Sequence, residues 1–178
     1  ISDAAHIQAF LEGRYLESTD PFLLADMDKA VARIRQALDD GEMIVVYGDF
    51  DADGVTSTVL LTQALRGLGA ERRQVRPYIP DRFDEGYGLN KEAIAEIKEF
   101  GTGLIITVDC GIRSLHEATY ANELGLDMII TDHHSIGREM PDVVAILNPK
   151  RPDSNYPEKM LAGVGIAYKL AQALYTEM

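Results

Sequence analysis

The sequence predicts an α/β fold, a mostly parallel five-stranded sheet flanked by helices, with a helical arm at the N-terminus. The first observation behind this prediction is that short apolar runs alternate with helix-forming segments through most of the chain. Such alternation favours right-handed βαβ crossovers and a parallel sheet. The second is that Asp and His residues follow directly after several of these runs. Because open parallel sheets bind ligands beyond the carboxyl ends of their strands, these residues are expected at one edge.

The helical arm is predicted over residues 1–41, ahead of a main domain over residues 42–178. A short helix is expected over residues 3–12 and a longer one from Asp20-Pro21 to Gly41, because proline is tolerated in a first turn and glycine suits the position after a helix. Apolar residues recur at helical spacing within the longer one: Phe22, Leu23, Met27, Ala30, Val31, Ile34 and Leu38. This apolar stripe predicts that the arm packs on the sheet.

The first two strands are expected over residues 43–46 and 75–79. The run over 43–46 is rich in β-branched residues and too short for a helix, which is typical of a buried strand. A helix follows it and ends at Gly67 and Gly69. Pro77 has no N–H to donate to a neighbouring strand, so the second strand is expected at the edge of the sheet.

Three further strands are expected over residues 104–108, 128–131 and 143–147. A helix over residues 90–100 precedes the first of them. Ser114 followed by Glu117 predicts a capping box for the next helix, which Gly125 ends. The link before the last strand is too short for a helix, so the pairing of that strand stays open. The last helix is expected to start at the turn over Gly163 to Gly165. The glycines there allow close packing, or the N-terminus of the helix favours an anion.

Length and composition are typical of one compact globular domain, with 178 residues of which 46% are apolar and 26% charged. No apolar run approaches the roughly 20 residues of a membrane span. No signal peptide opens the sequence, so a cytoplasmic location is expected. The single cysteine, Cys110, excludes an intrachain disulfide and is expected to be a small buried residue. Because the sequence begins at Ile1 and stops at Met178 inside a helical pattern, it is expected to be a piece of a longer protein.

The net charge of −12 argues against a general nucleic-acid clamp, since phosphate backbones are held by clustered Lys and Arg. It does not exclude an enzyme that acts on nucleic acid. Bound metal would neutralise part of an acidic cluster, and another domain could supply basic surface.

Seven candidate site residues follow the predicted strands: Asp49, Asp51 and Asp53 after the first, Asp109 after the third, and Asp132, His133 and His134 after the fourth. Each has an ordinary alternative, as a helix N-cap, part of a calcium loop or a surface pair. Their joint occurrence favours a two-metal site, which polarises a phosphate ester and activates water. Imidazole among the ligands shifts the expected metal from magnesium towards manganese, cobalt or zinc, with manganese favoured.

Three segments resemble the first three motifs of the DHH phosphoesterase superfamily: Asp49-Phe50-Asp51-Ala52-Asp53-Gly54, Val108-Asp109-Cys110-Gly111 and Asp132-His133-His134. Further segments resemble the RecJ-type exonucleases of that superfamily, which degrade single-stranded DNA from the 5′ end: Ile79 to Phe83, Gly86 to Leu89, Ala162 to Gly165, and Asp20-Pro21 with Met27-Asp28-Lys29-Ala30. The resemblance covers nearly the whole chain.

The resemblance implies a ligand set for two manganese ions, with magnesium as the alternative. Asp49 and Asp51 would serve one ion, Asp53 and His133 the other, with Asp109 as the bridge.

It also implies catalytic roles for Asp109, Asp132 and His134. His134 would face the scissile phosphate, and Asp132 would orient the neighbouring imidazoles. Arg82 is expected to contact phosphate through its guanidinium, and an ion pair with a neighbouring acidic residue is the equal alternative.

The function implied by the resemblance is metal-dependent hydrolysis of single-stranded DNA by the full-length protein. A single-strand-binding protein and a helicase are candidate partners. No membrane association is expected. The superfamily's fourth motif, an Asp ligand, and a second domain that grips substrate are not found before Met178. The 178 residues alone are therefore expected to be weak or inactive. Two alternatives are a phosphodiesterase acting on small oligonucleotides or cyclic dinucleotides, and a non-catalytic scaffold.

Overall fold

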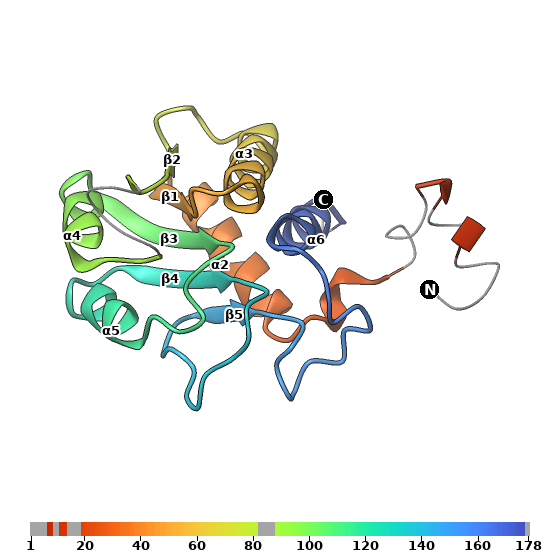
Figure 1. The fold of residues 1–178 in the computed structure, drawn as a ribbon. Helices are drawn as coiled ribbons and strands as arrows, with labels where there is room; N and C mark the ends of the chain where they lie inside the picture. Colours follow the sequence, from red (N-terminus) through yellow and green to blue (C-terminus); the bar gives the residue numbers. More distant parts are fainter. Residues whose placement is uncertain (1–6, 9–10, 14–18, 82–87, 177–178) are drawn as a thin grey trace.

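The computed structural model describes residues 7–8, 11–13, 19–81 and 88–176. Within them, five strands form one sheet in the order β2-β1-β3-β4-β5, and every neighbouring pair is parallel. The strands are β1 (Met43–Gly48), β2 (Val75–Tyr78), β3 (Thr102–Val108), β4 (Asp127–Thr131) and β5 (Ala145–Leu147). The predicted α/β fold is therefore confirmed (Figure 1).

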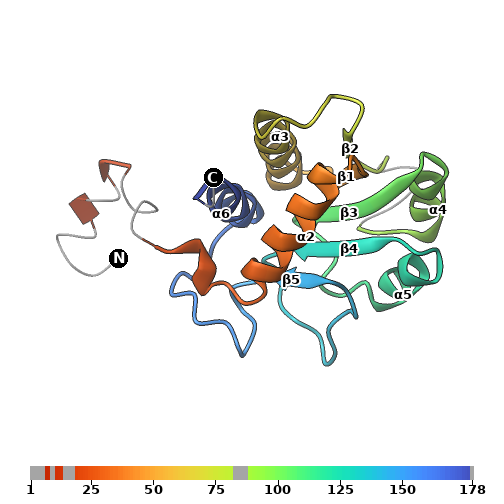
Figure 2. The ribbon, with the colours of Figure 1, turned by 180° about the vertical axis from the view of Figure 1, so that it is seen from behind.

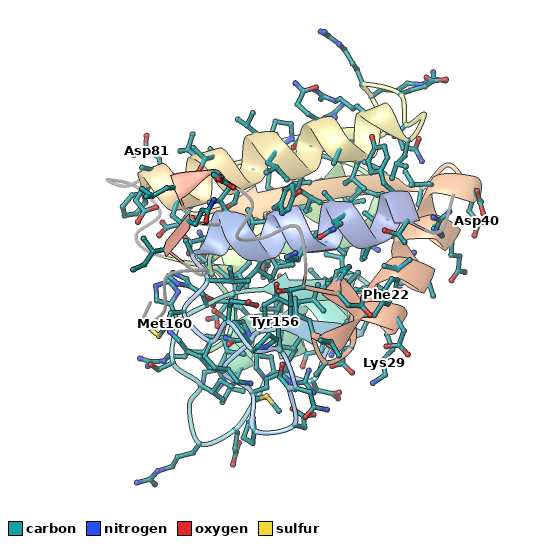
Figure 3. The ribbon with its side chains drawn as sticks, turned by 90° about the vertical axis from the view of Figure 1, so that its right-hand side faces the viewer. Phe22, Lys29, Asp40, Asp81, Tyr156 and Met160 are labelled. Atoms are coloured by element: carbon teal, nitrogen blue, oxygen red, sulfur yellow. The ribbon has the colours of Figure 1, made fainter. Side chains whose placement is uncertain are left out.

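Helices cover both faces of this sheet (Figures 1 and 2). One face carries α2 (Met27–Asp39), α3 (Ala52–Gly67) and α6 (Gly163–Thr176), and the other carries α4 (Lys91–Glu99) and α5 (Leu115–Glu123). Helices α3 and α6 run side by side (Figure 3). Alternate strand side chains enter the two apolar clusters, which is why the strands are apolar at successive positions.

The single long helix predicted from Pro21 is interrupted. A short 3-10 helix, η1 (Pro21–Leu23), comes first, and α2 begins only at Met27. Between them Asp26 adopts a left-handed backbone with φ of 61°. Its carboxylate pairs with Lys29 at 2.7 Å and with Arg151, a residue more than a hundred positions away. The break before this helix therefore coincides with a tertiary ion pair, which local periodicity could not predict.

Residues 7–8 and 11 are helical, and the rest of the helix predicted over residues 3–12 lies outside the described residues or in a turn.

The edge position predicted from Pro77 is confirmed, because β2 is an outer strand that pairs with β1 alone. The open question about the last strand is also answered: β5 pairs with β4 in parallel, although the residues between them, 132–144, form no helix. The sheet thereby continues past β4.

The predicted helix ends at Gly41 and Gly125 are confirmed, with φ of 69° and 66°. The capping box at Ser114 is wrong. Ser114 does occupy the N-cap position of α5, but its side chain makes no capping hydrogen bond. Among the described residues, no helix is both long and apolar enough to cross a membrane.

Candidate metal centre

The carboxyl ends of β1, β3 and β4 bring the predicted site residues together, and the arrowheads of β3 and β4 point towards α6 (Figure 1). Two groups of side chains have ligand atoms within 4.8 Å of one another: Asp49, Asp51 and Asp109 in one, and Asp109, His133 and His134 in the other. Asp109 belongs to both groups. The structure thus assembles residues from three strand ends into two adjoining clusters of oxygen and nitrogen donors.

Asp49 and Asp51 are positioned by the turn that joins β1 to α3. Asp49 is buried, and its Oδ1 accepts a hydrogen bond from the Phe50 N–H at 2.7 Å. Burial raises the pKa of the Asp49 carboxyl. Asp51 is the N-cap of α3, with Oδ1 accepting from the N–H groups of Asp53 (2.8 Å) and Gly54 (3.0 Å). The turn and the helix N-cap therefore hold both carboxylates at the carboxyl end of the sheet.

Asp109 is the most constrained member of the site. It is only 1% exposed, and its backbone has a φ of 62°, a conformation that non-glycine residues seldom adopt. Burial, followed by the negative charges of Asp53 and Asp51, raises the pKa of Asp109 to about 7. Its Oδ1 accepts no hydrogen bond from the described residues, although His133 Nε2 lies 3.1 Å away. A buried oxygen without a donor is destabilising unless something positive neutralises it.

Asp132 holds the second histidine in place. Its Oδ1 lies 2.7 Å from His134 Nδ1 and accepts from the His134 N–H at 2.9 Å. Its Oδ2 accepts from the Ile112 N–H at 2.9 Å. An Nδ1–H that donates to Asp132 places the imidazole lone pair of His134 on Nε2, which is the arrangement found behind metal-binding histidines.

Asp53 lies outside both groups. Its Oδ2 is 3.7 Å from His133 Nε2, and its two oxygens accept hydrogen bonds from the N–H groups of Gly163 and Val164, both at 2.7 Å. Asp53 therefore contacts both the start of α6 and His133 of the second group.

The residues that are present fit a divalent cation. Two other carboxylates and two imidazoles lie near the buried Asp109 oxygen that lacks a donor, and hard divalent ions of the manganese type accept this mixture of ligands.

The family model "DHH family, N-terminal domain" matches residues 43–178. The chain belongs to the DHH family. The single-stranded-DNA-specific exonuclease RecJ of Bacillus subtilis (strain 168) is 54% identical to it over 175 residues, which cover 98% of this chain and 22% of that protein. The chain spans about a quarter of the length of the curated relatives it matches.

Two solved structures resemble this DHH chain. A crystal structure of exonuclease RecJ bound to manganese matches with a TM-score of 0.77 and 38% identity, over 86% of this chain and 38% of that one. RecJ from Thermus thermophilus in complex with Mn2+ matches with a TM-score of 0.72 and 33% identity, over 97% of this chain and 25% of that one.

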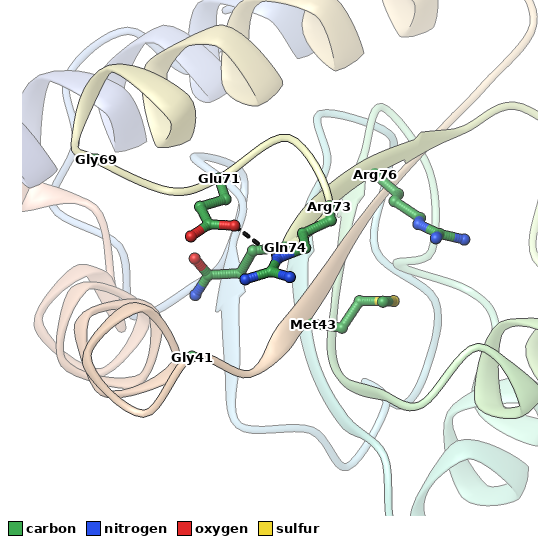
Figure 4. Close-up of a pocket in the computed structure, with 7 residues that line it drawn as sticks. All are labelled: Gly41, Met43, Gly69, Glu71, Arg73, Gln74 and Arg76. Carbon is green, nitrogen blue, oxygen red and sulfur yellow. Dashed lines mark ion pairs between the residues drawn. The ribbon is translucent and has the colours of Figure 1, made fainter.

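A cavity of about 550 Å³ adjoins the metal centre of the DHH chain. His134 and Asp132 form one wall, and the start of α5 with the apolar side chains of Leu89 and Ile112 forms another. A second cavity of about 550 Å³ lies at the opposite end of the sheet, beside Met43 (Figure 4). Its Arg73 is paired with Glu71 at 2.6 Å. Of these two cavities, the first is the one that shares residues with the site, namely Asp132 and His134.

Cys110 is buried at 2% exposure, as predicted, and burial raises the pKa of its thiol. Arg82 lies outside the described residues.

Two residues that sequence reasoning missed donate hydrogen bonds to the backbone carbonyls of His133 and His134, which we call the histidine turn. Asn148 is fully buried, and its Nδ2 donates to the His134 carbonyl at 3.0 Å. Lys150 Nζ donates to the His133 carbonyl at 2.5 Å, and its own N–H donates to Asn148 Oδ1 at 2.9 Å. Asn148 follows directly after β5, so the strand-end rule that identified the other site residues applied to it as well.

We expect Asn148→Ala to loosen this turn and to weaken Mn2+ binding about 10- to 100-fold, the range seen when a residue behind a metal ligand is removed. Titration of the metal-free chain with Mn2+, followed by calorimetry, measures the change. Asn122→Ala is the matched control, because the Asn122 amide donates to the Asp142 carbonyl at 2.8 Å on the exposed surface. Equal affinities for the two variants would mean that the turn does not depend on Asn148.

Proposed function

We propose that this chain is the metal-binding catalytic part of a 5′ to 3′ single-stranded-DNA exonuclease, which hydrolyses phosphodiester bonds with two divalent cations, manganese preferred. The observation that carries the proposal is the buried Asp109 carboxylate, which belongs to both candidate ligand groups. A shared carboxylate is what a pair of ions about 4 Å apart requires. The substrate class is supported by the relative with 54% identity, whose name specifies single-stranded DNA.

The proposed ligands are drawn from the two groups together with Asp53. Asp49, Asp51 and Asp109 would hold one ion, and Asp53, Asp109 and His133 the other, with His134 beside them. When bound, such ions supply a polarised phosphate ester and a water with a lowered pKa. The buried position of Asp109 keeps bulk water away from the shared oxygen, which strengthens its attraction for a cation.

His134 connects the metal centre to the substrate in this proposal. It belongs to one ligand group and also lines the adjoining cavity, so a phosphate that enters the cavity meets its ring. Asp132 acts as the residue that fixes the orientation of this ring, through Nδ1 at 2.7 Å. Arg82 remains a proposed phosphate contact, on the strength of its guanidinium donors.

We place the domain boundary just before β1, with a helical arm over residues 1–41 and the metal-binding domain over residues 42–178. Helix α2 of the arm shares an apolar cluster with β1 and β3, which supports an attached layer rather than an independent unit. Because the net charge is −12, we assign the grip on the DNA backbone to surface outside these 178 residues.

The test is a chimera in which these 178 residues replace the 175 aligned residues of the Bacillus subtilis exonuclease, to which they are 54% identical. We expect this chimera, with Mn2+, to release nucleotides from 5′-labelled single-stranded DNA. The chain alone should be at least about 100-fold slower, because it lacks the grip on DNA.

Two controls decide between the alternatives. The chimera carrying Asp109→Ala should lose release while remaining folded by circular dichroism. The unsubstituted chimera is also offered duplex DNA, 3′-labelled single strands and short dinucleotides, with Mg2+ in parallel with Mn2+. Hydrolysis of dinucleotides in the absence of single-strand release would transfer the function to the small-substrate branch of the family. A folded chimera that binds Mn2+ and cleaves neither substrate would contradict the proposal.

A further inference from the structure

We infer that Arg151 is a positioning residue for the metal centre, because it anchors the segment that holds the histidine turn. The inference deepens the proposed function and rests on it for the identity of the metal centre. Arg151 lies beyond the end of β5 and is only 8% exposed. Its backbone bonds to Asn148, the residue whose side chain reaches the His134 carbonyl. This juxtaposition carries the inference.

The guanidinium of Arg151 is held from three sides. Nη1 donates to the Ile146 carbonyl at 2.7 Å and pairs with the Asp26 carboxylate, while Nε and Nη2 donate to the two oxygens of Asp153 at 2.9 and 2.7 Å. A guanidinium is planar and offers its donors in a fixed fork, so these bonds set its orientation as well as its position. The Asp26 carboxylate also accepts from the Ile146 N–H at 3.4 Å. Arg151 therefore joins the start of α2 to the outer strand β5.

The backbone of Arg151 closes a turn that begins at Asn148. Its N–H donates to the Asn148 carbonyl at 3.2 Å. From this turn, the Asn148 amide donates to the His134 carbonyl and Lys150 Nζ donates to the His133 carbonyl. One end of the turn is fixed by β5 and the other by the guanidinium. Arg151 therefore keeps both donors within reach of the histidine turn, although it touches neither imidazole itself.

A second arginine makes the same kind of contact at the opposite end of the sheet. The side chain of Arg33, in α2, is 12% exposed and pairs with Glu42 at 2.7 Å and with Asp127 at 2.6 Å. Asp127 is the first residue of β4, and Glu42 directly precedes β1, so both pairs lie at the amino ends of strands. The metal centre lies at the carboxyl ends. Arg33 thus matches Arg151 in burial and in pairing with two carboxylates, and serves as its control.

The test compares Arg151→Gln with Arg33→Gln. Each change removes a mostly buried charge that pairs with two carboxylates, so both should lower the urea concentration at which the chain unfolds. Only Arg151→Gln should weaken Mn2+ binding, measured by calorimetry. We expect a loss of about 3- to 10-fold, below the range of about 10- to 100-fold seen for a residue directly behind a metal ligand.

A second readout needs no metal. The Asp132 N–H donates to the Leu147 carbonyl at 3.1 Å, and the His134 N–H donates to Asp132 Oδ1 at 2.9 Å. Residue-resolved hydrogen exchange of these two amides in the metal-free chain reports how firmly the histidine turn is held. Arg151→Gln should speed their exchange at least about threefold relative to Arg33→Gln.

Arg151→Lys is the conservative variant. Lysine keeps the charge, but its single ammonium cannot reproduce the fork that meets Asp26, Asp153 and the Ile146 carbonyl together. We expect Mn2+ affinity between those of Arg151→Gln and the unsubstituted chain. If Arg151→Gln does not fold, Asp26→Asn, which removes one of its partners, takes its place in both comparisons.

Two results would overturn the inference. One is Mn2+ affinity and amide exchange in Arg151→Gln equal to those of the unsubstituted chain. The other is an equal loss of affinity in Arg33→Gln, which would mean that general destabilisation causes the effect. If the unsubstituted chain itself does not bind Mn2+, the proposed function fails. The metal-free exchange then still decides whether Arg151 holds the histidine turn.

Discussion

Asp109→Asn is expected to stabilise the metal-free chain at pH 8 while abolishing its metal binding. The folded state holds this carboxyl at a pKa of about 7, raised from 3.8 by burial and by the charges of Asp53 and Asp51. Between these two values the folded chain binds a proton that the unfolded chain has released. Folding stability therefore falls as the pH rises from about 4 to about 7.

The size of this effect follows from the shift. At roughly 1.4 kcal/mol per pKa unit, the ionised Asp109 lowers stability by up to about 4 kcal/mol above pH 7. Asparagine has nearly the same shape and cannot ionise, so we expect Asp109→Asn to recover about 1 to 4 kcal/mol at pH 8 and little at pH 4. Urea unfolding of both proteins at the two pH values, with a chelator present, measures the difference. A stability difference between the two proteins that does not increase from pH 4 to pH 8 would contradict the prediction.

The effect of Asp109→Asn on folding stability should change from stabilising to destabilising when metal is present. An ion that binds only the folded chain stabilises it by about 2.7 kcal/mol at a concentration 100 times its dissociation constant. The unsubstituted chain should gain this stability on addition of Mn2+, and Asp109→Asn should not. Asp40→Asn is the control, because Asp40 is exposed at the far end of α2. It should respond to Mn2+ as the unsubstituted chain does and change stability by less than about 0.5 kcal/mol.

Gly54→Ala is expected to destabilise the chain by about 3 kcal/mol and to displace Asp49 from the metal centre. A Cβ on Gly54 would lie 2.4 Å from the Asp49 carbonyl oxygen and 2.6 Å from the Asp49 Cβ. The contact is with backbone, which cannot rotate away as a flexible side chain would. The start of α3 and the Asp49 backbone must therefore move apart. The Asp51 carboxylate is displaced with α3, and the Asp49 carboxylate with its own backbone.

Thermal unfolding and Mn2+ titration of this variant check both effects. Gly137→Ala is the matched control. The new Cβ would lie 3.5 Å from the Glu139 carbonyl, an ordinary contact, and the backbone there does not have a positive φ. We expect the control to unfold within about 0.5 kcal/mol of the unsubstituted chain. Equal stability of the two variants would contradict the prediction, because it would mean that the turn after β1 accommodates a Cβ at Gly54.

Sequence by itself determined the sheet and the edge at which the site forms. Short β-branched runs separated by helical segments leave few arrangements other than a parallel sheet, and in such a sheet the ends of β1, β3 and β4 must lie together. Asp49, Asp109 and Asp132 could therefore be predicted as neighbours from their place after each run. The edge position of β2 followed in the same way, from the missing N–H of Pro77.

Only the tertiary structure decided what each polar group bonds to. Asp26 lies at the break in the predicted helix and pairs with the distant Arg151, and Ser114 stands at the start of α5 without capping it. Asp53 looks like its two neighbours in sequence, yet its oxygens are held by α6, while Asn148 supports a histidine turn that precedes it. Local pattern predicts burial and strand ends because apolar periodicity is a property of neighbouring residues. Hydrogen-bond partners are set by packing between distant segments, and no local pattern contains them.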